Sequence, residues 1–99
     1  MSLIVRVRFF TILREIVGKR EETLSFQSGE KVDVNVVLRY LVDRYGRSFE
    51  DYVFDSRTGK VKGFLQLLVN GRSLTNVNDF KTELQDGDVL AIVPPVGGG

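Results

Sequence analysis

The architecture of this chain follows from one central segment, Asp33-Val-Asn-Val-Val-Leu-Arg-Tyr-Leu-Val-Asp-Arg-Tyr-Gly46. Its apolar residues fall at helical spacings and make a single stripe: Val34, Val37, Leu38, Leu41, Val42 and Tyr45. Asp33 can cap the first amides of this helix, and Gly46 supplies a stop at its C-terminal end. Because β-branched residues are poor helix formers, burial against a sheet must supply most of the helix's stability. The segment therefore predicts a sheet that the helix covers.

The residues before this segment predict two strands joined by a short helix. Residues 3–10 alternate as a half-buried strand does, and one face carries Leu3, Val5, Val7 and Phe9. Residues 12–17 have helical spacing, and Gly18 follows as a stop. The charged run 19–22 is interpreted as a solvated turn. Residues 23–27 alternate again and predict a second strand paired with the first.

The residues after the segment predict a hairpin and a last strand. Residues 47–63 are less regular, and four of them are interpreted as a satellite cluster: Phe49, Tyr52, Val53 and Phe54. Residues 64–69 are strand-like, and Asn70-Gly71 favours a two-residue type I′ turn into residues 72–74. Residues 89–93 form a short apolar strand that Pro94-Pro95 halts.

This order of elements predicts an α+β fold of β-grasp (ubiquitin-like) type. One helix is wide enough to cover one sheet, so the economical arrangement is a mixed sheet with the main helix packed on one face. We assign residues 1–93 to this domain and residues 94–99 to a flexible tail. A length of 99 residues with 42% apolar and 27% charged residues is ordinary for a single globular domain.

The composition excludes several classes of function. The chain has no Cys and no His, so thiol chemistry is absent and no metal site is expected. Its 14 Lys and Arg nearly balance its 13 Asp and Glu, which gives no support to nucleic-acid or membrane binding. The sequence shows neither a signal peptide nor an apolar run long enough to span a bilayer, so a cytoplasmic location is expected.

Two polar groups deserve a functional and a structural interpretation. Asp86 and Asp88 flank Gly87. One interpretation is an acid/base pair or a cation site; the favoured interpretation is a pair of turn residues that bond the local backbone. Arg6 and Arg8, beside Phe10, could contact phosphates, but a solvated sheet face is favoured.

The C-terminal segment, Pro94-Pro95-Val96-Gly97-Gly98-Gly99, has a shape suited to entering another protein. The two prolines stiffen the exit from the strand. Six residues at roughly 3.3 Å each reach about 20 Å, and glycines can thread a channel too narrow for other residues. The group delivered is a bare α-carboxylate, which becomes reactive once it is converted to an acyl-adenylate. The alternative interpretation of the tail alone is an inert Gly-rich end.

Three segments together resemble the MoaD/ThiS group of ubiquitin-like sulfur carriers. This group comprises the small subunit of molybdopterin synthase, the thiamine sulfur carrier and the related small archaeal modifier proteins. The resemblance lies in Phe9-Phe-Thr-Ile-Leu-Arg-Glu-Ile-Val-Gly18, in Leu68-Val-Asn-Gly71, and in Leu84-Gln-Asp-Gly-Asp88 through Pro94-Pro-Val-Gly-Gly-Gly99. It covers the chain in the right order. The three terminal glycines stand where the family pattern usually has two, so Gly97 occupies a variable position.

The resemblance implies a mechanism and a set of site residues. An ubiquitin-activating-like enzyme, using ATP and Mg²⁺, would adenylate the carboxylate of Gly99, with Gly98 beside it. A sulfur donor protein would then convert this end to a thiocarboxylate, and the large subunit of molybdopterin synthase would consume the sulfur to build the dithiolene. No cofactor would be bound by the chain itself, which would be a co-substrate rather than a stand-alone catalyst. Contact with partners is expected from Ala91, Val93, Pro94, Pro95, Val96 and Gly97.

Two other functions stay open at this point. A protein modifier would use the same activation step and join Gly99 to lysine amines. A β-grasp interaction module would have an inert tail. The pattern Pro-Pro-Val-small-Gly-Gly favours the sulfur carrier.

Overall fold

The computed structural model describes residues 2–95, except for the side chains of residues 77 and 78. The elements are β1 (Ser2–Phe9), α1 (Ile12–Val17), β2 (Glu21–Gln27), α2 (Val34–Tyr45), α3 (Arg47–Val53), β3 (Gln66–Val69), β4 (Arg72–Ser73), η1 (Val77–Lys81) and β5 (Val89–Val93). The strands form one sheet in the order β2-β1-β5-β3-β4. β1 and β5 run parallel, and the other pairs are antiparallel. This is the mixed sheet of the predicted ubiquitin-like fold.

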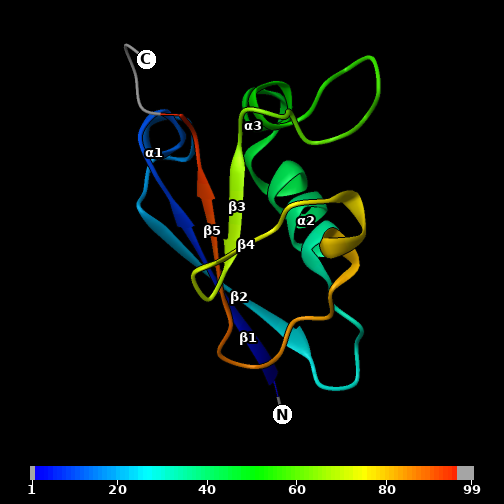
Figure 1. The fold of residues 1–99 in the computed structure, drawn as a ribbon. Coiled ribbons are helices and arrows are strands. Elements are labelled where there is room, and N and C mark those ends of the chain that lie inside the picture. The colour runs from blue at the N-terminus through cyan, green and yellow to red at the C-terminus, as the bar shows by residue number, and fades with distance from the viewer. Residues whose placement is uncertain (1, 96–99) are drawn as a thin grey trace.

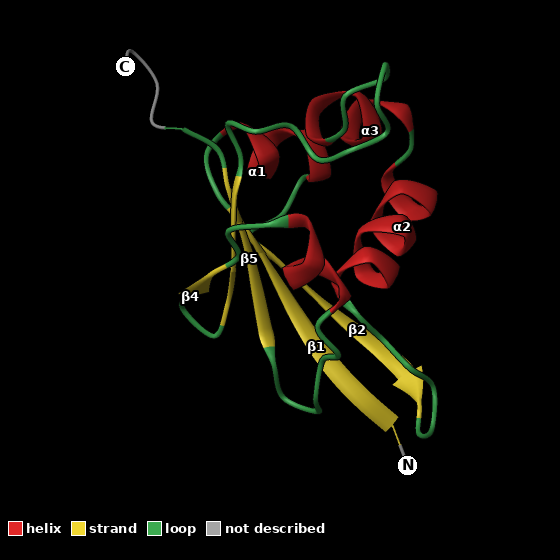
Figure 2. Ribbon diagram, turned by 45° about the vertical axis from the view of Figure 1, so that its right-hand side comes forward, coloured by secondary structure: helices red, strands yellow, loops and turns green. Residues whose placement is uncertain are grey.

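The helices cover one face of the sheet and leave the other open (Figures 1 and 2). Val5, Val7 and Phe9 of β1 are fully buried beneath them, as the alternation in residues 3–10 predicts. The stripe on α2 supplies the helix side of this core with Val34, Val37, Leu38 and Leu41. The predicted packing of the main helix on the sheet is therefore confirmed.

Both ends of α2 also follow the prediction. The Asp33 carboxylate accepts a hydrogen bond from the Val36 amide at 2.8 Å. Gly46 ends the helix at φ 81°, a conformation that favours glycine. The predicted hairpin turn is equally clear, because Asn70 and Gly71 both have positive φ, at 51° and 83°.

The interpretation of Phe49, Tyr52, Val53 and Phe54 as a satellite cluster was wrong for Phe49 and Val53. Residues 47–53 form α3, and Phe49 and Val53 are fully buried in the main core. The rings of Phe9 and Phe49 meet edge to face, with centroids 6.5 Å apart. The apolar residues of this helix span only about two turns, so their spacing in the sequence was too weak a signal to predict it. The packing of Phe49 against the sheet reveals it.

Several boundaries also differ from the predicted ones. β2 begins at Glu21 rather than residue 23, and β3 begins at Gln66 rather than residue 64. β4 contains only Arg72 and Ser73, and the short helix η1 was not predicted. No helix within residues 2–95 has the length and apolar character that crossing a membrane requires.

Candidate functional site

β5 is the element that leads into the C-terminal segment, and the sheet holds it on both sides. β1 pairs with it in parallel and β3 pairs with it antiparallel. Leu90 and Ile92 are fully buried in the core, whereas Ala91 and Val93 are half-buried on the open face. Ala91 and Val93 are the two strand residues from which partner contacts are expected, and this register leaves both on the outer face. The end of β5 is therefore a fixed point from which residues 94–99 continue.

The open face around β5 carries a small apolar surface. Arg8 of β1 and Leu68 of β3 lie on either side of Ala91, and Gln66 lies beside Val93. We call the half-buried apolar side chains that β3 and β5 place on this face the open-face strip; they are Leu68, Val89, Ala91 and Val93. Exposure of these half-buried side chains costs the free chain little free energy. A partner that covers them gains binding free energy from their burial.

Positive charge and an aromatic ring border the open-face strip. The guanidinium groups of Arg8 and Arg14 both lie over the Phe10 ring, with 5.6 and 5.4 Å to its centroid. Arg14 also donates from Nε to the Phe9 carbonyl at 3.0 Å. Arg8 faces Glu21 across the strand pair at 3.9 Å. Arg6 and Arg8 are both exposed, as the favoured interpretation of a solvated sheet face expects. Nothing tests the alternative, in which they contact phosphates.

Exposed apolar side chains flank the point where β5 ends. Ile12 of α1 is 40% exposed, and Phe64, just before β3, is 50% exposed. The pairing of Phe9 with Ile92 and of Gln66 with Val93 puts both at this end of the sheet, where Figure 1 shows α1 beside β5. Pro95 is exposed and Pro94 is buried. The other predicted tail residues, Val96, Gly97, Gly98 and Gly99, lie outside the described residues.

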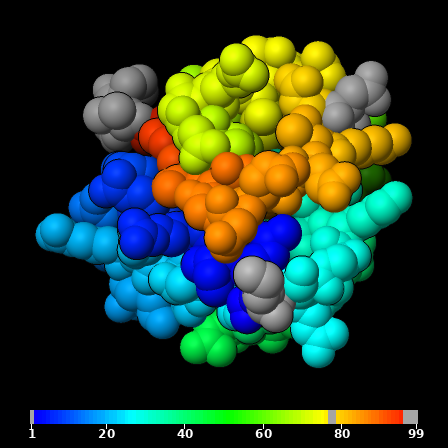
Figure 3. Space-filling view, turned by 90° about the horizontal axis from the view of Figure 1, so that it is seen from below, coloured from blue at the N-terminus to red at the C-terminus, as the bar shows by residue number. Residues whose placement is uncertain are grey.

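Asp86 and Asp88 have the structural role that the sequence favoured, but with more distant partners. Asp86 accepts a hydrogen bond from the Ile4 amide at 2.8 Å, and Asp88 accepts from the Asn70 side chain at 2.9 Å and from the Gln85 amide at 2.8 Å. They tie the turn before β5 to the start of β1 and to the β3–β4 hairpin. Figure 3 shows the segment before β5 (orange) lying against the start of β1 (blue).

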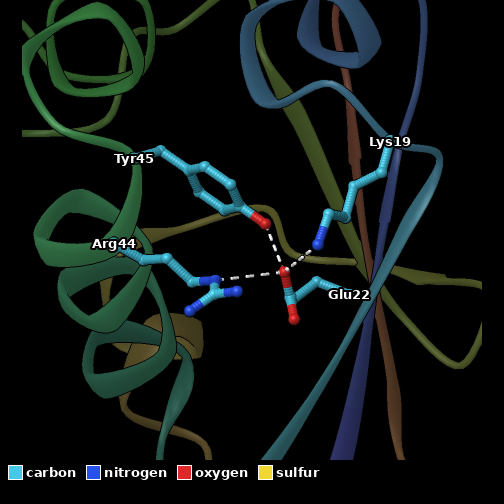
Figure 4. A network of polar contacts seen from close by, with 4 residues as sticks. All are labelled: Lys19, Glu22, Arg44 and Tyr45. Carbon is cyan, nitrogen blue, oxygen red and sulfur yellow. Dashed lines mark hydrogen bonds and ion pairs between the residues drawn. The ribbon is translucent and has the colours of Figure 1, made fainter.

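A polar network lies between α2 and the start of β2 (Figure 4). Glu22 accepts hydrogen bonds from the Tyr45 hydroxyl and from Lys19, the latter at 3.0 Å, and Arg44 lies 3.3 Å away. The Glu22 side chain is only 13% exposed. The interpretation of residues 19–22 as a solvated turn was therefore wrong for Glu22, which faces the helix layer from a strand.

The network shifts the pKa of Glu22 and of Tyr45, which are both partly buried. Partial burial alone would raise the pKa of Glu22, but the hydrogen bonds from Tyr45 and Lys19 outweigh it and lower the pKa below its usual value. Burial, together with the bond to Glu22, raises the pKa of Tyr45. Within residues 2–95, no group of three or more Asp, Glu, His or Cys side chains is arranged to hold a metal ion.

The sequence pattern placed Phe10 beside Arg6 and Arg8, but it did not single out Leu68, Ile12 and Phe64 as parts of this surface. Alternation in residues 64–69 indicated that alternate side chains face opposite ways, but not that Leu68 lies beside Ala91. That neighbourhood depends on the pairing of β3 with β5, whose paired residues are 21 to 27 positions apart along the chain.

The sequence of this chain is similar to that of known small proteins. A model of the ThiS family matches residues 7–99. Small archaeal modifier protein 3 of Haloferax volcanii is 34% identical over 99 residues, which cover 96% of this chain and 98% of the relative. A candidate sulfur carrier protein of Archaeoglobus fulgidus is 34% identical over 70 residues, or 71% of this chain and 77% of the relative.

Solved structures of small proteins also superpose on this chain. Small archaeal modifier protein 1 of Methanosarcina acetivorans superposes with a TM-score of 0.79 at 30% identity, over 100% of this chain and 99% of that one. A candidate molybdopterin converting factor subunit 1 of Pyrococcus furiosus superposes with a TM-score of 0.70 at 28% identity, over 96% of this chain and 100% of that one.

Proposed function

The chain belongs to the ThiS family of small ubiquitin-like proteins, and from this premise we propose that it carries sulfur on its C-terminal glycine. In this proposal the carboxylate of Gly99 is adenylated by an ubiquitin-activating-like enzyme and is then converted to a thiocarboxylate. The large subunit of molybdopterin synthase takes the sulfur from it. The chain serves these reactions as a co-substrate.

One observation carries the proposal: the strand before the tail is the central strand of the sheet. Leu90 and Ile92 anchor β5 in the core, while Ala91 and Val93 remain on the open face beside the start of the tail. A partner that covers the open-face strip thereby fixes where residues 94–99 begin. Apolar contact supplies affinity, and the cations beside Phe10 favour a partner surface with acidic residues at its rim.

The chemistry follows from the carboxylate. Attack of a carboxylate oxygen on the α-phosphate of ATP, which Mg²⁺ accompanies as a substrate of the activating enzyme, releases pyrophosphate and leaves an acyl-adenylate. A persulfide sulfur of the donor protein then bonds to the carbonyl carbon while AMP leaves with the bonding pair. A thiol cleaves the resulting acyl disulfide, and the terminal sulfur stays on the glycine carbonyl. Adenylation is needed because a free carboxylate is a poor electrophile.

The molybdopterin role is the finer part of the proposal. Two things support it: the likeness to the molybdopterin converting factor subunit of Pyrococcus furiosus, and the tail pattern Pro-Pro-Val-small-Gly-Gly. Its test is reconstitution with the large synthase subunit of the same organism and the thiocarboxylated chain, with dithiolene formation as the readout. Failure to form the dithiolene, with a chain that is demonstrably thiocarboxylated, would assign the sulfur to another pathway.

The activation step is tested by deleting Gly98 and Gly99. We expect circular dichroism to stay unchanged, because the core lies within residues 2–95, and ATP–pyrophosphate exchange by the cognate activating enzyme to be abolished. Deletion of Ser2 from the other end is the control and should leave exchange intact. Undiminished exchange by the tail deletion would refute the proposal.

A second function, lysine modification, is supported by the identity to small archaeal modifier protein 3 over nearly the whole chain. Lys19, Lys31, Lys60 and Lys81 are exposed, so the chain could also modify itself. Intact-mass analysis of protein from its native host separates the two. We expect a free chain with one terminal oxygen replaced by sulfur, and a population mainly in isopeptide adducts would establish the modifier instead.

A further inference from the structure

The outer edge of β2 has main-chain groups that pair with no other strand among residues 2–95. Phe9 donates to the Arg20 carbonyl at 2.8 Å, so in this antiparallel pair Glu22, Leu24 and Phe26 also turn their main-chain groups toward β1. The alternate residues of β2 turn theirs outward. Glu30 occupies the outward groups of Gln27, accepting from its amide at 2.9 Å and donating to its carbonyl at 3.1 Å.

Three residues with outward main-chain groups therefore remain along this edge: Glu21, Thr23 and Ser25. β2 is the first strand in the sheet order, and within the described residues no strand pairs with its outer side. An edge of this kind is a template for an additional strand.

Exposed apolar side chains lie beside this edge on its helix side. α2 runs antiparallel to β2, since the Phe26 and Tyr40 rings meet at 5.9 Å and Arg44 lies against Glu22. Val36 and Tyr40, one helical turn apart, are 38% and 42% exposed. They are two of the four large hydrophobic side chains that the described residues expose, and the other two lie near the end of β5.

The Glu21 end of the edge has an excess of positive charge. Lys19 and Arg44 both contact the single carboxylate of Glu22, and Arg20 is exposed beside them. Glu21 lies within 3.9 Å of Arg8 on the open face. At the opposite end, Glu30 and Lys31 balance each other. The helix side of the edge is thus apolar at its Phe26 end and cationic at its Glu21 end.

We propose that this β2 edge surface, made of the main chain of Glu21, Thr23 and Ser25 with the side chains of Phe26, Val36 and Tyr40, binds an extended segment of a partner protein. The segment adds a strand antiparallel to β2. Its apolar side chains alternate and cover Phe26 and Tyr40. Acidic residues follow them and lie beside Lys19, Arg20 and Arg44.

An extended partner segment that ends in acidic residues matches the charges of the β2 edge surface better than a second copy of the chain does. In an antiparallel pair of two β2 strands centred on Thr23, Arg20 of one copy falls opposite Phe26 of the other, and neither cationic end meets an acidic group. The edge surface is also separated from β5 by β1. A partner bound there leaves the open-face strip free, so this inference does not depend on the proposed function.

The test uses a short synthetic peptide, capped at both ends, in which Ile and Val alternate with Thr and a run of Glu follows. Titrated into the full chain, it should shift the amide resonances of Thr23 and Ser25 and slow their hydrogen exchange about tenfold. The same peptide N-methylated at alternate residues should not bind. Replacing the Glu run by Lys should weaken binding about tenfold, as expected for several surface charge contacts.

Matched variants locate the site. Tyr40→Ser and Arg20→Glu should each weaken binding several-fold, whereas Phe64→Ser and Arg72→Glu, the same changes away from β2, should not. Circular dichroism checks that each variant is folded. The proposal is overturned by equal binding of the N-methylated peptide, by shifts centred on the open-face strip, by absence of a saturable shift, or by a dimer of the chain that excludes the peptide.

Discussion

At the scale of single residues, Glu22 connects more of the molecule than any other charged side chain described above. Its carboxylate holds Lys19 from the α1–β2 connection and both Arg44 and Tyr45 from the end of α2. Tyr45 in turn packs its ring edge to face against Phe9, at 6.1 Å between centroids. A carboxylate so placed costs desolvation, and it stabilises the fold because three donors meet it.

Glu22→Gln should lower the free energy of unfolding at neutral pH by about 1–2 kcal/mol. The pKa of Glu22 is lowered in the fold, so its contribution is present above the ordinary value of 4.5 and is lost as the pH falls through the folded-state pKa. Urea unfolding from neutral to acidic pH should therefore show the wild-type advantage shrinking in acid. Glu15→Gln, an exposed change on α1, is the control. An advantage that stays constant into acid would contradict this account.

At the scale of elements, the two faces of β5 have different roles. Leu90 and Ile92 pack in the core, and Ala91 and Val93 lie on the open face. Substitutions on the two faces should consequently have different effects, the inner ones on stability and the outer ones on partner binding.

Val93→Asp should weaken binding to the activating enzyme or to the large synthase subunit by at least tenfold, the range expected for a central interface residue. The melting temperature should fall only slightly, because Val93 is half-buried before the substitution. Isothermal titration and thermal denaturation measure the two effects. Ser25→Asp, on the same face but on β2, should change neither appreciably. If Val93→Asp unfolded the domain instead, the outward role of Val93 would be refuted.

At the scale of the whole molecule, an aromatic cluster joins the two segments of the helix layer to the sheet. Phe49 of α3 lies 6.5 Å from Phe9 of β1 and 6.2 Å from Tyr45 of α2, measured between ring centroids. Phe49 is fully buried. The cluster therefore makes α3 part of the single core rather than an appendage.

Phe49→Ala should destabilise the chain by about 3–5 kcal/mol, the usual result of leaving a cavity the size of a buried ring. The loss should appear as one cooperative shift of the urea midpoint for both helix and sheet signals. Phe64→Ala, at an exposed ring, should shift the midpoint far less. Loss of the α3 signal alone, with the rest unfolding as before, would mean that α3 is an independent unit.

Local patterns in the sequence were enough to predict the main helix with both its ends, the strands of the sheet and the Asn70-Gly71 turn. Each of these depends on residues a few positions apart: the spacing of apolar side chains, a capping carboxylate, or a glycine at positive φ. The family was also recognisable from the order of its segments. The reactive role of Gly98 and Gly99 follows from that resemblance and stays a prediction, since both lie outside the described residues.

Tertiary structure alone decided which distant segments meet. Leu68 joins Ala91 on the open face because β3 pairs with β5, and Phe49 enters the core because α3 returns to β1. Glu22 belongs to a charged run, yet it is partly buried because Tyr45 and Arg44 at the end of α2 contact its carboxylate. The outer edge of β2 is open because, in the described part of the chain, the sheet order places no strand beyond it. Residue spacing cannot encode these relations, since they arise when burial of one common core selects a single arrangement of elements.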